Sequence, residues 1–180
     1  MVTSATPTAA LASTNWVGTV NTSLSSLYLG NYAGALGETW ALLIIVIGVI
    51  LAYRKVFDWR IPTSYIATAF ILAFVSGCVT GVNPFTNALT HIALGGMMFG
   101  AVFMATDPVT SPTSPLGKFI YGICWGTLTR LIRLKGTFPE GVLFSILIMN
   151  MFTPMIDNLT LGRTDNKYGK QIFGQKSADF

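Results

Sequence analysis

Five apolar runs follow one another between Glu38 and Leu159, and they constrain the fold more than any other feature of the chain. They cover residues 38–55, 61–82, 84–106, 117–134 and 140–159, about 18 to 23 residues each. At a rise of about 1.5 Å per residue, a helix of that length crosses a hydrocarbon layer about 30 Å thick. Charged residues make up only 10% of the chain, against about 25% in soluble domains, and the mean hydropathy is +0.60. We therefore predict an all-α integral membrane protein with about five transmembrane helices, which excludes a disordered chain and an ordinary cytosolic enzyme.

The composition divides the chain into three segments. Residues 1–37 are polar and rich in small residues, among them Gly30, Gly34 and Gly37. Here we expect a surface helix followed by a re-entrant or half-helix segment, because irregular backbone at membrane depth must be covered by protein. Residues 38–160 form the predicted transmembrane domain, and residues 161–180 form a tail. The first twelve residues have neither the basic nor the apolar region of a signal peptide.

Basic residues indicate how the domain is oriented. If the N-terminus is outside, eight of the eleven lysines and arginines fall on the cytoplasmic side. They lie in the loop at 54–60, at Lys118 and in the tail. Arg130, Arg133 and Lys135 fall on the outer side and are the exceptions. Because cytoplasmic loops carry an excess of Lys and Arg, we predict that the N-terminus is outside and the tail is in the cytoplasm.

Glycine spacing indicates where the helices pack closely. Gly96 and Gly100 are four residues apart in the third run, and Gly122 and Gly126 are four apart in the fourth. Small residues at this spacing let two helix backbones approach each other. A compact helix bundle is sufficient to explain them.

The cysteines and the single histidine have simple interpretations. Cys78 and Cys124 fall inside apolar runs, so we expect buried thiols and no disulfide framework. One histidine excludes a site built from several histidines. His91 is expected to be hydrogen-bonded between helices, although binding of a proton or a quinone head group is an alternative.

The few acidic residues near the apolar runs are candidates for an ion path, because ionisable groups at membrane depth are costly and usually face a cavity or a partner. Asp157 ends the fifth run beside Asn150, and Pro154 between them removes a backbone donor and frees the carbonyl of Asn150. Carboxylate, amide and carbonyl oxygens suit a hard cation. Asp107 lies in a proline-rich loop and is expected to begin a turn. Glu38 is a further candidate, and we expect Asp157 to contribute more than Asp107, with a helix end as the alternative for Asp157.

The segment Thr3-Ser4-Ala5-Thr6-Pro7 is short, small and uncharged. Small neighbours leave the hydroxyl of Thr6 accessible, and Pro7 disfavours helical geometry there. On these physical grounds alone it is a frayed terminus.

Together with the rest of the chain, this segment resembles a family of membrane flavoproteins. The family comprises the D-type subunit of the Rnf electron-transport complex and the B-type subunit of the sodium-translocating NADH:quinone oxidoreductase. Of the two proteins, the Rnf subunit is the more similar. The resemblance is found in the stretches VTSATP, LGNYAGALGETWALL, YRKVFDWRIP, GGMMFGAVFMATDPVTSP, GKFIYGICWG and FPEGVLFSILIMNMFTPMID.

The resemblance implies a covalent cofactor. It implies that FMN is attached to Thr6 through a phosphoester bond, with Ser4, Ala5 and Pro7 completing the motif and Ser4 standing where glycine is common. It also allows riboflavin as a second flavin. Family members have about ten spans in two repeats with a fold like that of urea transporters, so this chain corresponds to the C-terminal half and to one repeat.

The implied function is that of a membrane component of an ion-translocating ferredoxin:NAD⁺ oxidoreductase. Electron transfer would be coupled to transport of Na⁺ or H⁺ across the inner (plasma) membrane of a prokaryote. The partners would be the other membrane and peripheral subunits, including one with FMN that faces outward. Trp16, Tyr28 and Tyr32 are available to stack on the flavin, with anchoring at the membrane interface as the alternative. The competing functions are half of a small-solute channel without a redox role, and a purely structural bundle.

Overall fold

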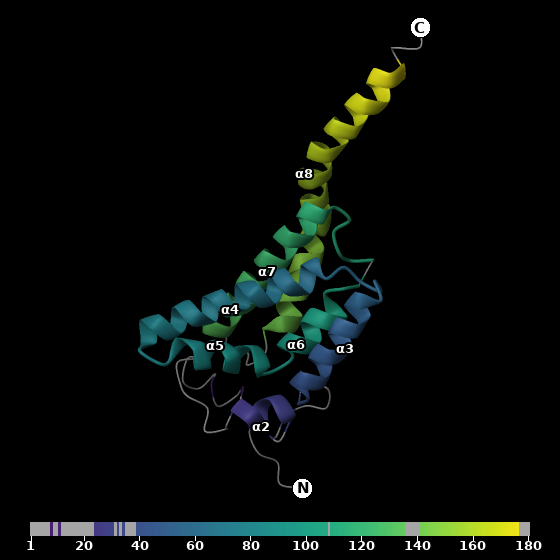
Figure 1. Ribbon diagram of the computed structural model, residues 1–180. Helices are drawn as coiled ribbons and strands as arrows, with labels where there is room; N and C mark the ends of the chain where they lie inside the picture. Colours follow the sequence, from purple (N-terminus) through teal and green to yellow (C-terminus); the bar gives the residue numbers. More distant parts are fainter. Residues whose placement is uncertain are drawn as a thin grey trace.

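A computed structural model shows a helical protein (Figure 1). It describes Thr8, Leu11, residues 24–30, Tyr32, Gly34 and residues 39–107, 109–135 and 141–176, with only the backbone described after residue 160. The elements are α2 (Leu24–Leu29), α3 (Ala41–Tyr53), α4 (Arg60–Thr80), α5 (Pro84–Ala93), α6 (Met97–Phe99), the π-helix η1 (Gly100–Met104), α7 (Pro115–Lys135) and α8 (Val142–Lys176). In Figure 1, α2 and the C-terminal turns of α8 lie at opposite ends of the molecule.

The packing of α7 against α4 depends on two glycines. A Cβ atom on Gly122 would lie 2.9 Å from the carbonyl oxygen of Ile61 and would also meet the hydroxyl of Ser64. A Cβ atom on Gly126 would lie 3.1 Å from the carbonyl oxygen of Tyr65. At Gly122 a Cβ would require a neighbouring atom to shift, and at Gly126 it would require an adjustment of a few tenths of an ångström, so the prediction of close helix packing at these glycines is confirmed.

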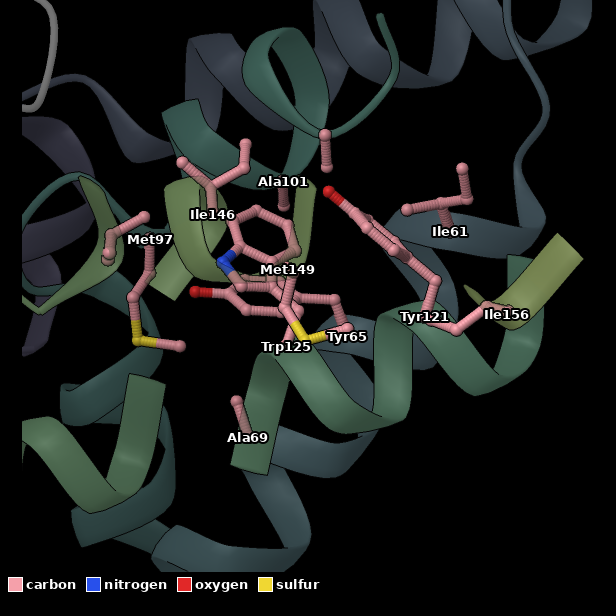
Figure 2. Close-up of a cluster of buried hydrophobic side chains, with 12 residues drawn as sticks. Ile61, Tyr65, Ala69, Met97, Ala101, Tyr121, Trp125, Ile146, Met149 and Ile156 are labelled. Atoms are coloured by element: carbon pink, nitrogen blue, oxygen red, sulfur yellow. The ribbon is translucent and has the colours of Figure 1, made fainter. Parts of the chain in front are cut away.

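The main core cluster lies where α4, α7 and α8 meet (Figure 2). The rings of Tyr65 and Trp125 stack with their centroids 3.7 Å apart. Trp125 donates its indole N–H to Ser145 Oγ at 2.9 Å, so the polar edge of a fully buried ring is satisfied. Ile146 and Met149 bring α8 into the same cluster. These contacts join three helices that are far apart in the sequence.

The helical class is confirmed, but fewer candidate spans are found than the five predicted. Among the described helices, two are long and apolar enough to cross a membrane, Arg60–Thr80 and Val142–Thr160, and a bent pair of helices raises the number to three. The first run forms a helix of 13 residues, Ala41–Tyr53, which is about 20 Å long and shorter than the hydrocarbon layer. The fourth run forms the 21-residue α7, which carries Arg130, Arg133 and Lys135 in its last two turns and is not among the candidate spans.

The third run, predicted as one transmembrane helix, is broken. It forms α5 and then α6 with η1, and the two parts meet at a bend of 68°. Leu94 has an extended backbone (φ −87°, ψ 132°) and Gly95 has φ +70°, a conformation that favours glycine. Irregular backbone within the apolar runs therefore occurs between α5 and α6. Most of the segment 13–37, for which a re-entrant element is predicted, lies outside the described residues, and α2 is its described helix.

The outer faces of the helices are apolar. Exposed side chains include Val49 on α3, Ile71 on α4 and Leu147 on α8, as suits helices that face lipid. Cys78 and Cys124 are both exposed and neither forms a disulfide, so the prediction of buried thiols is wrong. Both lie on faces of long apolar helices that turn away from the core.

Candidate functional site

The flavin-attachment motif predicted at Thr6, with Ser4, Ala5 and Pro7, lies outside the described residues, as do Trp16 and Glu38. The nearest described residues are Thr8 and Leu11, and both are buried. Leu11 packs in a cluster with Leu27 of α2 and with Ala93 and Leu94 at the end of α5. The segment that follows the motif is therefore anchored where α5 ends and the backbone breaks.

The two described aromatic candidates lie beside this anchor. Tyr28 and Tyr32 are partly buried and pack against the cluster that contains Leu11. Tyr28 also donates its hydroxyl to the carbonyl oxygen of Leu89 on α5, at 3.4 Å. Tyr28 thus links α2 to α5. A stacking role for either ring stays a prediction.

Polar residues of α8 bind the loop that connects η1 to α7. The Asp157 carboxylate accepts the backbone N–H of Thr113, with distances of 3.1 and 3.3 Å to its two oxygens. The hydroxyl of Thr153 donates to the carbonyl oxygen of Thr110 at 3.0 Å. The hydroxyl of Ser114 donates to Thr160 Oγ1 at 2.6 Å. Asp157 therefore holds a loop in place, in addition to any role in an ion path.

Asp107 begins a turn, as predicted, and it also faces a cavity. Its carboxylate accepts the backbone N–H of Val109 at 3.2 Å and the hydroxyl of Thr110 at 3.4 Å. A cavity of about 560 Å³ is lined by Asp107, Thr106, Thr110 and Asn150, together with apolar residues of η1 and α8.

Asn150 lines this cavity together with Asp107, and a joint role of Asn150 with Asp157 stays a prediction. The amide oxygen of Asn150 also accepts the hydroxyl of Tyr121 at 2.7 Å, which fixes its orientation. The sequence alone places no comparable set of oxygen atoms near Asp107, yet the described hydroxyl and amide groups around the cavity form one. The ion-path role of each carboxylate stays a prediction.

Two arginines form a buried cluster that the sequence interpretation missed. Arg130 and Arg133 are one turn apart on α7 and are only 5% and 1% exposed. Arg130 Nη1 lies 3.1 Å from His91 Nδ1, and Nη2 donates to Ser76 Oγ at 2.6 Å. Arg133 donates to the carbonyl oxygens of His91 and Leu94, both at 3.3 Å. These carbonyls lie at the end of α5, where a helix leaves its last acceptors unpaired, so Arg133 binds the broken end of the helix.

The prediction for His91 is confirmed, since it is buried and hydrogen-bonded between α5 and α7. The two arginines are buried against neighbouring helices and are not the exposed anchors that the count of basic residues assumes, whereas the side of the membrane on which they lie stays a prediction. Their positions on α7 contain a signal for this burial: Gly122, Gly126, Arg130 and Arg133 recur every three or four residues, so all four lie on the helix face that meets α4.

Comparison with known proteins agrees with the resemblance noted in the sequence. A family model described as NQR2, RnfD, RnfE family matches residues 1–165. The chain belongs to this family. It is 45% identical over 136 residues to the D-type subunit of a proton-translocating ferredoxin:NAD(+) oxidoreductase complex from Clostridium ljungdahlii, covering 75% of this chain and 40% of that protein. It is 41% identical over 135 residues to the D-type subunit of a Na(+)-translocating complex of the same type from Acetobacterium woodii, again 75% and 40%.

Relatives in the NQR2, RnfD, RnfE family differ in the reaction that their names give. The B-type subunit of the Na(+)-translocating NADH-quinone reductase from Chlamydia pneumoniae is 39% identical over 147 residues, covering 75% of this chain and 29% of that protein. The chain thus spans about two fifths or less of the length of these relatives. The names of the two ferredoxin-dependent relatives, at similar identity, specify different ions, H⁺ and Na⁺.

Proposed function

We propose that this chain is the flavin-carrying part of the D-type subunit of an ion-translocating ferredoxin:NAD⁺ oxidoreductase. The observation that carries the proposal is the family match, which runs over residues 1–165 and therefore includes the Thr6 segment. The higher identity to the two D-type proteins, compared with the quinone reductase protein, favours the ferredoxin-dependent complex. The protein resides in the inner (plasma) membrane of a prokaryote, with the other subunits of the complex, including an outward-facing FMN subunit, as its partners.

FMN is held through a phosphoester bond to the Thr6 hydroxyl in this proposal. Bound there, the flavin supplies the electron-transfer chemistry, while the protein holds and orients it. Two observations suit this role: Thr8, two residues further on, is buried, and Leu11 is fixed against Ala93 and Leu94. A cofactor attached to Thr6 is thereby tied to the end of α5 and not to a free chain end.

Replacement of Thr6 tests the flavin directly. The variant Thr6→Val, produced together with the flavin transferase, is expected to lose the in-gel fluorescence of the denatured chain and the mass increment of FMN. Thr14→Val is the matched control, because it removes a threonine hydroxyl outside the Thr3–Pro7 segment and should keep the flavin. Retention of flavin by Thr6→Val, or an unmodified mass for the wild-type chain, would contradict the proposal. An unmodified mass for the wild-type chain would favour a passive small-solute channel.

The transported ion, Na⁺ or H⁺, passes the loop between η1 and α7 in this proposal. Asp107 and Asn150 line the cavity there, and Asp157 binds the backbone of the same loop at Thr113. Glu38 remains a further candidate for the path. Because an amide oxygen can also accept the Thr113 N–H, Asp157→Asn removes the charge and keeps the hydrogen bond, whereas Asp157→Ala removes both.

The two roles of Asp157 predict different results in an assembled complex. If its charge serves the ion, Asp157→Asn loses ion-dependent turnover with unchanged flavin content, which is the result we predict. If Asp157 only holds the loop, Asp157→Asn works normally and Asp157→Ala does not. Asp107→Asn is measured in parallel, and a larger loss there than in Asp157→Asn would reverse the ranking of the two carboxylates.

A further inference from the structure

Two neighbouring cavities lie beside the connection from α3 to α4, one toward the loop before α7 and the other between α3, α4, α6 and η1. The larger, about 770 Å³, has polar and aromatic walls and the smaller, about 150 Å³, is almost entirely apolar. Ala52, Phe57 and Trp59 line both, so the two cavities adjoin. The larger cavity is called the polar compartment below, and the smaller one, between the helices, the apolar compartment.

The polar compartment contains a cation that is not neutralised. Lys118 and Asp58 line it and form an ion pair with each other. Lys55 also lines it, and none of the described residues provides a carboxylate for its ammonium group. The hydroxyl-bearing residues Ser111 and Thr113 lie in the same wall. The compartment therefore carries one net positive charge beside hydrogen-bonding groups, which suits an anion.

Lys55 occupies a backbone position where glycine is the usual residue. It has φ +55°, and it is the one non-glycine residue in the described part of the chain with a positive φ. Its N–H donates to the carbonyl oxygen of Ala52 at 3.0 Å, and the N–H of Val56 donates to that of Leu51 at 3.1 Å. These two bonds define a Schellman motif at the end of α3, whose left-handed residue is normally glycine.

A lysine at that position costs free energy, because its Cβ is crowded in the left-handed conformation. Such strain is typical of residues that clamp a ligand. The end of α3 does not need a lysine side chain at position 55. The side chain instead gives the polar compartment its one charge that has no counter-ion among the described residues.

We propose that the two adjoining cavities bind an anionic glycerophospholipid, with its phosphate on Lys55 and an acyl chain in the apolar compartment. The site joins a charged end to an apolar end, as a lipid does. Tyr53 and Trp59 at its entrance are 89% and 56% exposed, and such aromatic residues favour the head-group level of a bilayer. The exposed faces of α3 and α4 leave the apolar compartment open to the hydrocarbon layer.

Native mass spectrometry of the full chain in detergent tests this site. Phosphatidylglycerol is added as the anionic lipid, phosphatidylcholine as the zwitterionic one, and menaquinone as an uncharged molecule with a head and a tail. We expect wild-type protein to retain phosphatidylglycerol in preference to both. Lys55→Gly should weaken retention about fivefold, the effect of one basic residue near a phosphate, and should keep the helix end because glycine suits φ +55°.

Two further variants separate a specific site from a general surface charge. Arg54→Gln removes an exposed charge next to Lys55 that lines neither cavity, so lipid retention should stay unchanged. Lys55→Arg keeps a cation at this position and should keep lipid retention close to that of the wild type. Equal binding of phosphatidylcholine, preferential binding of menaquinone, equal losses in Arg54→Gln and Lys55→Gly, or full retention in Lys55→Gly would each overturn the proposal.

Discussion

Replacement of Gly122 by alanine tests how closely α7 packs on α4. The new Cβ would lie 2.9 Å from the carbonyl oxygen of Ile61, which is helix backbone, and would overlap the hydroxyl of Ser64. Overpacking of this kind costs about 1 to 3 kcal/mol. Alanine recovers about 1 kcal/mol through its higher helix propensity. Because the carbonyl belongs to rigid backbone, we expect a cost near the upper limit and a net destabilisation of about 1 to 2 kcal/mol.

Thermal unfolding in detergent, followed by tryptophan fluorescence, measures this loss. A net loss of that size lowers the Tm of a chain of this length by about 3 to 6 °C. Gly126→Ala is the matched control, because its Cβ would meet Thr68 and the carbonyl oxygen of Tyr65 at 3.1 Å, and slight adjustment relieves those contacts. Adding Ser64→Ala to Gly122→Ala should restore part of the stability. A Gly122→Ala protein as stable as wild type would refute the close approach of the two helices.

Two more predictions concern the core and the orientation. Ser145→Ala leaves the buried indole N–H of Trp125 without its acceptor. We expect the free energy of unfolding to fall by about 1 kcal/mol and the fluorescence emission of Trp125 to shift. Equal stability of variant and wild type in a urea or heat titration would contradict the hydrogen bond. A reporter fused after Phe180 should be active only in the cytoplasm, as the distribution of basic residues predicts, and activity only on the outer face would reverse the topology.

Helix positions and one packing seam could be predicted from the sequence, because local patterns determine them. Each apolar run forms helix in the structure, and the spacing of Gly122 and Gly126 identifies the face of α7 that meets α4. Apolar content also identifies the class of protein. These features depend on residues within one or two helical turns, so a single sequence contains enough information about them.

The break in the third run could not be predicted in this way. A glycine pair such as Gly95 and Gly96 fits both a close helix contact and a left-handed turn. What decides between them is the acceptor groups at the end of α5 and the donor that binds them. That donor, Arg133, lies 39 residues beyond Leu94 along the chain. A pattern within a few helical turns therefore cannot predict this contact.

The buried arginines show why charge counting misplaced part of the chain. The positive-inside rule treats every Lys or Arg near the end of a span as an anchor at the membrane edge. Arg130 and Arg133 instead bind Ser76 on α4 and His91 and Leu94 at the end of α5, so they stabilise irregular backbone inside the domain. Without these two, the basic residues that oppose the predicted orientation are reduced from three to Lys135 alone. The 21-residue α7 is not among the candidate spans, and two of its charges, Arg130 and Arg133, are buried and bind neighbouring helices.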